Sequence, residues 1–92
     1  MSKNQANQSH LLSSGLGTAI DSELTVLASI EARYAHELTR LESSGTPPSV
    51  KERLRQQLDA RRKMARKPHV LRLAELYAEA QTRELFSRNT RH

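Results

Sequence analysis

The sequence predicts an all-α protein built as an antiparallel helical hairpin with a coiled-coil-like seam, and three observations indicate this class. Apolar residues recur at steps of three and four, which is the spacing of one face of an α-helix. The pattern stops at the turn Gly45–Pro48 and then resumes. No run alternates between apolar and polar residues as a strand does. The first arm of the pattern comprises Leu12, Leu16, Ile20, Leu24, Leu27, Tyr34, Leu38 and Leu41, and the second Val50, Leu54, Leu58, Ala65, Leu71 or Leu73, Leu76 and Ala80.

The first helix is expected to span about 18–43. Residues 1–10 are polar and are predicted to form a disordered arm ahead of a hairpin domain at 11–86. Gly15 and Gly17 weaken any helix by about 1 kcal/mol each, so residues 11–17 are expected to form a loose first turn or a separate short helix. Thr18 and Asp21 then suit the N-cap and the first turn.

The second helix is expected to begin at Ser49, which forms a capping-box pattern with Glu52 three residues later. Gly45 is the candidate for a left-handed C-terminal cap on the first helix. Pro68 predicts a kink or a break, since proline in a helix interior removes a backbone hydrogen bond. The hairpin therefore has two or three helices, and residues 87–92 are predicted to be a frayed tail.

The register of the hairpin follows from the two apolar patterns. Glu31 is the one charged residue that interrupts the first apolar pattern, and Arg61 interrupts the second. When the two patterns are aligned antiparallel, Glu31 lies opposite Arg61. Opposite charges at facing positions of the seam predict an ion pair that fixes the register of the two helices. The alternative is that Glu31 lies at the edge of the seam and reaches water.

A net charge of +5 lies mainly in residues 50–67. A solvated helix surface is the first interpretation of this stretch; the others are a basic docking face for an acidic protein and, after that, a site for nucleic acid. No Trp or Phe lies among the basic residues, so no platform for stacking bases is visible. The expected face consists of Arg62, Lys63, Arg66 and Lys67.

The chain is short and only 36% hydrophobic, so its core is expected to be small. It has no cysteine, which excludes stabilisation by a disulfide. A homodimer or an obligate complex with another protein is therefore expected, because monomers rarely expose large apolar patches. The predicted contact residues beside the seam are Val26, Ile30, Val70, Leu73 and Tyr77.

Motifs for catalysis are missing from the sequence. There is no cysteine nucleophile, no glycine-rich phosphate loop and no pair of histidines at helical spacing. The segment Ala19–Leu24 resembles small all-helical chorismate mutases, which act on a dianionic substrate through basic side chains. That family carries an arginine shortly before this segment, where Leu16, Gly17 and Thr18 stand here. The chain is therefore expected to be non-enzymatic, with no cofactor, metal or small-molecule substrate.

The turn and the start of the second helix, residues 45–52, resemble in design the small hairpin co-chaperones of type III secretion, which bind a larger helical-repeat chaperone. Phage or plasmid regulators that dock on a host protein share the same design. The resemblance implies an adaptor, co-chaperone or regulator; the alternative is a small, basic, dimeric nucleic-acid-binding protein. Because no apolar run could form a signal or a membrane span, a cytoplasmic location without a membrane partner is expected.

Overall fold

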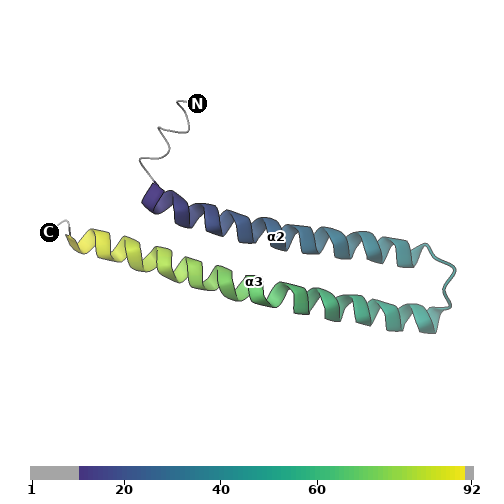
Figure 1. Cartoon of the computed structure of the whole chain (residues 1–92). Coiled ribbons are helices and arrows are strands. Elements are labelled where there is room, and N and C mark those ends of the chain that lie inside the picture. Colours follow the sequence, from purple (N-terminus) through teal and green to yellow (C-terminus); the bar gives the residue numbers. More distant parts are fainter. Residues whose placement is uncertain (1–10, 91–92) are drawn as a thin grey trace, which may run out of the picture.

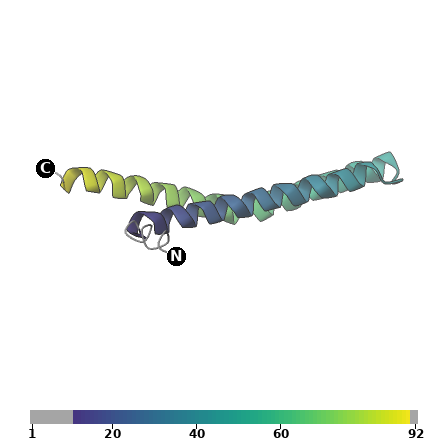
Figure 2. The same cartoon turned by 90° about the horizontal axis from the view of Figure 1, so that it is seen from above.

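The computed structural model describes the backbone of residues 11–90 and the side chains of residues 15–86. Helix α2, Leu11–Glu42, and helix α3, Pro48–Thr90, run antiparallel and are joined by one short turn (Figure 1). The predicted all-α hairpin is confirmed, with two helices and no third one between residues 11 and 90. The molecule is an extended rod 66 Å long. Seen from above, the helices overlap near the turn and diverge toward the open end (Figure 2).

Helix α2 begins at Leu11 and continues through Gly15 and Gly17, so the expected start at residue 18 is wrong. Neither glycine has a positive φ, and both therefore take ordinary helical angles. Each costs a helix about 1 kcal/mol relative to alanine. This cost is tolerated because extending an existing helix adds one hydrogen bond per residue without a new nucleation step. The predicted disordered arm, residues 1–10, lies outside the described residues.

The C-terminus of α2 is capped by serine hydroxyls and not by Gly45. Gly45 has no positive φ, so the predicted left-handed cap is wrong. The Ser44 backbone NH donates to the Leu41 carbonyl at 3.1 Å, and its hydroxyl donates to the same carbonyl at 2.7 Å. The Ser43 hydroxyl donates to the Thr39 carbonyl at 2.8 Å. Because these groups satisfy the last carbonyls of the helix, no left-handed residue is needed.

Helix α3 begins at Pro48, one residue earlier than expected. The Lys51 NH donates to the Pro47 carbonyl at 2.8 Å, which is the first hydrogen bond of the helix. Ser49 therefore lies inside the first turn, and the predicted capping box does not form. Proline is well suited to the first helical position, since its φ is already helical and its missing NH would have no partner there. The Glu52 carboxylate accepts hydrogen bonds from Arg55 and from Gln56.

Pro68 lies inside α3 and does not end it. The predicted alternative of a break, with a third helix beyond, is wrong. On either side of the proline, Arg66 and His69 bond to α2, through Glu31 and Glu23 respectively. These contacts hold both flanks of Pro68 against α2, which offsets the missing hydrogen bond. The helix also continues through Thr90, into the stretch expected to be a frayed tail.

The hairpin has almost no core of its own. Among the described side chains, Leu76 is the one buried hydrophobic residue, with 3% of its surface exposed. Most of the other seam residues are half-buried because two helices cover each other on one side only. Four residues of the predicted seam are exposed instead, and of the alternatives Leu71 and Leu73 it is Leu73 that lies in the seam; the four are Leu24, Val50, Ala65 and Leu71. No helix in the described part of the chain is long and apolar enough to cross a membrane. The large exposed apolar side chains are Leu24, Val50, Met64, Val70, Leu71, Tyr77, Leu85 and Phe86.

Candidate docking surface

The two long edges of the hairpin, where α2 meets α3, differ in chemistry. Along one, which we call the paired edge, carboxylates of α2 bond to basic side chains of α3. From the turn toward the open end, these contacts join Glu42 to Arg55 and Glu31 to Arg62 and Arg66. We call the other edge the open edge, since no such contact closes it over residues 30–41 of the described chain. Farther toward the open end of the hairpin, Glu23 contacts His69.

The contact next to the turn joins the ends of both helices. Arg55 donates two hydrogen bonds to the Glu42 carboxylate, one of them 3.2 Å long from Nη2 to Oε1, and a further one to Glu52. These bonds lower the pKa of Glu42 and raise that of Arg55. Lys51 Nζ donates to the Glu42 carbonyl at 3.2 Å, where a cation stabilises the C-terminal end of a helix. The turn is therefore stabilised by these charged side chains as well as by its backbone hydrogen bonds.

The central contact places Glu31 between two arginines. Arg66 Nη1 donates to Glu31 Oε2 at 2.7 Å, and Arg62 Nη1 donates to Oε1 at 3.3 Å. Partial desolvation alone would raise the pKa of Glu31, but the hydrogen bonds from both guanidinium groups outweigh it and lower the pKa. The predicted register pair with Arg61 is wrong. Arg62 and Arg66 lie one helical turn apart and both bond to Glu31, whereas Arg61 lines the groove and makes no such bond.

Arg62 is also held from two further sides. Its Nη2 donates to Asp59 Oδ1 at 2.6 Å, and its guanidinium carbon lies 4.6 Å from the centre of the Tyr34 ring. Lys63 Nζ lies 3.1 Å from the other Asp59 oxygen. The hydrogen bonds from Arg62 and Lys63 lower the pKa of Asp59.

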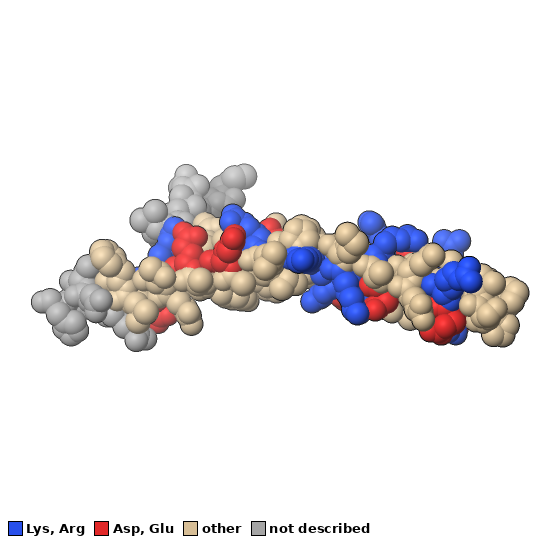
Figure 3. Space-filling model, turned by 90° about the horizontal axis from the view of Figure 1, so that it is seen from below, with Lys and Arg blue, Asp and Glu red and all other residues tan. Residues whose placement is uncertain are grey.

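The predicted basic docking face is therefore divided by the fold. Arg62 and Arg66 are neutralised by Glu31 and Asp59. Lys63 also contacts Asp59, although its side chain stays 70% exposed. Lys67 is exposed and makes no ion pair with a described residue. Figure 3 shows that basic side chains still predominate on the side of α3 that faces away from α2, over the half next to the turn.

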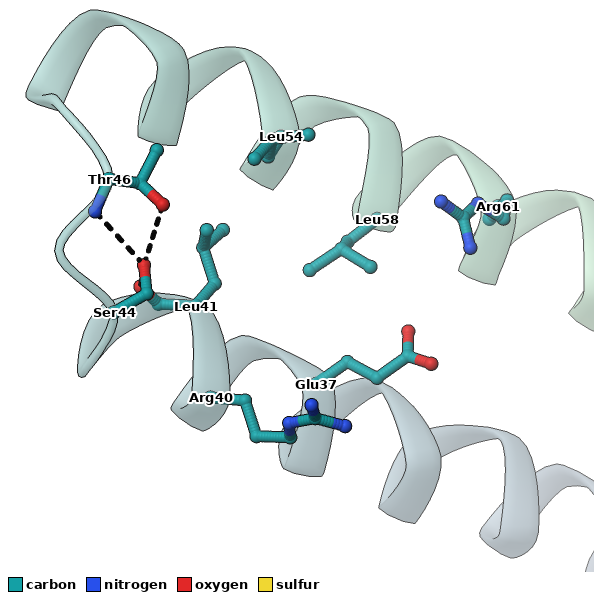
Figure 4. A pocket seen from close by; sticks show the side chains of 8 residues that line it. All are labelled: Glu37, Arg40, Leu41, Ser44, Thr46, Leu54, Leu58 and Arg61. Atoms are coloured by element: carbon teal, nitrogen blue, oxygen red, sulfur yellow. Dashed lines mark hydrogen bonds between the residues drawn. The ribbon is translucent and has the colours of Figure 1, made fainter.

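The open edge contains an apolar groove that sequence reasoning missed. It consists of two adjoining hollows of about 400 and 320 Å³, which share Glu37, Leu58 and Arg61. Figure 4 shows the hollow next to the turn. Its end is closed by Ser44 and Thr46, where the Ser44 hydroxyl bonds to both the hydroxyl and the backbone NH of Thr46. Both helices supply the apolar floor of the groove, which is formed by Ile30, Tyr34, Leu41, Leu54, Leu58 and Ala65.

Three exposed arginines form the rim of the groove together with one glutamate. Arg33 and Arg40 come from α2 and Arg61 from α3. None of the three makes an ion pair with a described residue. Arg62 also lines the second hollow, but its guanidinium group is bound by Glu31 and Asp59. Glu37 lies between them, and its carboxylate points into the groove (Figure 4). The rim thus combines three unpaired positive charges with one negative charge.

The predicted contact residues are dispersed over the hairpin. Ile30 lines the groove, and Val26 is half-buried on α2 one turn away from it. Val70, Leu73 and Tyr77 lie on the other half of α3 and do not line the groove. The signal that could have found the rim is the spacing of Arg33, Glu37 and Arg40. Residues three, four and seven apart share one helix face, and this face adjoins the apolar pattern.

No group of three or more potential metal ligands occurs among the described residues. Comparisons of the chain with protein-family models, with curated proteins and with solved structures found no match. The groove and its charges are therefore the features of this chain that bear on its function.

Proposed function

We propose that this protein is a non-enzymatic binding module, an adaptor, co-chaperone or regulator, that docks on another protein by taking an acidic amphipathic helix into its groove. The observation that carries the proposal is the contrast between the two edges. Along the paired edge, arginines of α3 are satisfied by carboxylates of α2. Along the open edge, Arg33, Arg40 and Arg61 surround an apolar floor without any such partner among the described residues.

The shape of the groove favours a helix as its occupant. The groove lies between two antiparallel helices, where the side chains of a third helix fit between those of the first two. Apolar residues at three- and four-residue spacing on the incoming helix would cover Tyr34, Leu41 and Leu58. The half-buried seam of the hairpin would thereby become the core of a three-helix bundle.

The charge of the rim favours an acidic partner. Three arginines against Glu37 leave an excess of two positive charges around the groove. Carboxylates beside the apolar face of the incoming helix would pair with these guanidinium groups, which suits Arg because its donors match a carboxylate in pairs. A basic helix would meet repulsion from the same groups, so the rim would select the partner by charge.

The test measures fluorescence anisotropy of the full chain with three labelled probes. The first probe is an amphipathic helical peptide with a leucine face flanked by glutamates. The second has lysines in place of the glutamates, and the third is a short DNA duplex. The proposal expects the acidic peptide to bind and the basic peptide to bind at least about tenfold more weakly, which corresponds to roughly 1.4 kcal/mol.

Two matched variants locate the site. Arg33→Glu with Arg40→Glu reverses two charges on the rim, whereas Lys63→Glu with Lys67→Glu reverses two outside the groove. The rim variant should bind the acidic peptide about tenfold more weakly or worse, and the second variant should bind it as the parent does. Absence of binding by the acidic peptide would overturn the proposal. So would tight, steeply salt-dependent binding of the duplex that is lost in the Lys63 and Lys67 variant, since this indicates nucleic acid as the partner.

A further inference from the structure

A second apolar surface lies on the outer face of α3, the face turned away from α2. Four of the large exposed hydrophobic residues belong to it: Val50, Met64, Leu71 and Leu85. Met64 is 76% exposed, Leu71 57% and Leu85 59%. They occupy one seven-residue repeat, whose remaining positions are Gln57 and Ala78. A coiled-coil seam has two apolar positions in every seven residues, and this repeat supplies one of them, with large apolar side chains at four of its six places.

We propose that the outer face of α3 binds a second copy of this chain, with the two α3 helices packed antiparallel. The repeat is self-complementary in this direction. When Met64 of one copy lies opposite Leu71 of the other, Val50 lies opposite Leu85, and Gln57 lies opposite Ala78. Each large apolar side chain therefore meets another, and the contact is symmetric about an axis near Lys67 and Pro68, as an isologous dimer requires.

The charges along the outer face favour the same direction. In the half of α3 next to the turn, Arg53 is exposed and makes no ion pair with a described residue, and the side chain of Lys63 is 70% exposed. In the half toward the open end, residues 69–86 carry three glutamates against Arg72 and Arg83, a net charge of −1, and Glu75 and Glu79 contact these two arginines of their own helix. An antiparallel dimer places the strongly basic half of each copy over the weakly acidic half of the other, whereas a parallel one places the two basic halves together. Figure 3 shows the basic half on the side of the turn.

This contact leaves the groove free. None of the side chains at the seven-residue repeat lines the groove. Lys67, near the symmetry axis, can extend its ammonium group to water while its alkyl stem covers the seam. The dimer would thus carry two grooves, one on each copy, and would be independent of the proposed docking of a partner helix.

The test introduces opposite charges at two facing positions of the proposed dimer contact. Sedimentation of the full chain at micromolar concentration then measures whether it is a monomer or a dimer. The variants are Met64→Lys and Leu71→Glu. The parent should sediment as a dimer and each variant alone as a monomer, because each places charges against an apolar side chain. An equal mixture should regain the dimer mass, since Lys at 64 of one chain then lies opposite Glu at 71 of the other. In a parallel dimer position 64 faces 64, so mixing would restore nothing.

Circular dichroism shows whether each variant keeps the helicity of the parent, and Leu24→Lys, at an exposed apolar site on α2, is the control that should stay dimeric. A parent that is monomeric would overturn the proposal, as would variants that both remain dimeric. A mixture that stays monomeric would overturn the antiparallel register. The monomeric Met64→Lys variant should still bind the acidic peptide, because the groove does not depend on the dimer. This measurement distinguishes failure of the dimer proposal from failure of the groove proposal.

Discussion

Arg62 connects more parts of the hairpin than any other residue described here. One guanidinium group reaches Glu31 on α2 and Asp59 on α3 while it covers the Tyr34 ring. Its Nε is buried and has no hydrogen-bond partner. The flat, forked guanidinium can serve two carboxylates and a ring at once, which an ammonium group cannot do. The contact therefore depends on arginine as such and not only on a positive charge.

We predict that Arg62→Lys lowers the melting temperature even though the charge is kept. The lysine variant can bond one carboxylate but loses the second and the stacking on Tyr34. Lys63→Ala is the control, because that side chain is largely exposed and should contribute little. Thermal melts followed by circular dichroism measure both. Equal melting temperatures for Arg62→Lys and the parent would mean that the guanidinium geometry has no role.

Acid should weaken the hairpin through the carboxylates of its ion pairs. The pKa values of Glu31, Glu42 and Asp59 are all lowered in the folded state. A lowered pKa stabilises the fold above the unfolded value, and this stabilisation is lost as the pH falls through the folded value. We predict a constant melting temperature from neutral pH to about 5 and a decline below it, near the ordinary pKa of 4.5 for glutamate.

Glu31→Gln tests the contact that joins one carboxylate to two arginines. The variant should melt lower than the parent at neutral pH, because Arg62 and Arg66 lose their shared carboxylate. It should also lose less stability on acidification, so the two curves should converge at low pH. Parallel curves would show that Glu31 does not contribute to the acid sensitivity.

Helix α2 contains two glycines whose role is not steric. A methyl group at Gly15 or Gly17 would meet nothing within 4 Å, and both residues have ordinary helical φ values. We predict that Gly15→Ala and Gly17→Ala each raise the stability by about 0.5–1 kcal/mol, since alanine restricts the unfolded chain and favours helix. Denaturant titrations measure the change. A loss of stability would mean that something packs against this part of α2 in solution.

Helix α3 continues through Pro68, which destabilises the helix. An interior proline removes one backbone hydrogen bond and is about 3 kcal/mol less favourable than alanine. Pro68→Ala should therefore stabilise the hairpin by about 1–3 kcal/mol, the lower end applying if the helix already bends to relieve the strain. Hydrogen exchange of the amides around residue 68 should slow in the variant. Unchanged exchange and stability would show that the proline costs nothing here.

The whole molecule exposes too much apolar surface for its size. A rod 66 Å long with a single buried hydrophobic side chain among those described has little to offset the entropy of folding. Association that covers this surface would stabilise the fold by mass action. We predict that the melting temperature rises with protein concentration across about a hundredfold range. The monomeric Met64→Lys variant should have a lower melting temperature that does not depend on concentration. A melting temperature of the parent that does not change with concentration would mean that the single hairpin is stable without association.

The candidate site was predictable only in part. Sequence reasoning found the apolar seam and Ile30, but it grouped Arg62 and Arg66 with Lys63 and Lys67 as one basic face. It also missed Arg33, Arg40 and Arg61 as a rim. Which cations stay free depends on which carboxylates lie within reach on the other helix, and this is a property of the packed pair. A helix turns by about 100° per residue, so Arg62 comes within reach of Glu31 while its neighbour Arg61 does not.

The sequence by itself determined the helical hairpin and the place of its turn. Both depend on short-range physics: apolar residues at helical spacing, and Gly45, Pro47 and Pro48 between them. Only the tertiary structure decided that α2 extends through its glycines, that α3 continues through Pro68, and that Glu31 pairs with Arg62 and Arg66. In each case contacts between the helices, or the continuity of a long helix, outweigh a local preference of about 1–3 kcal/mol. The groove, too, exists only once the two helices lie side by side.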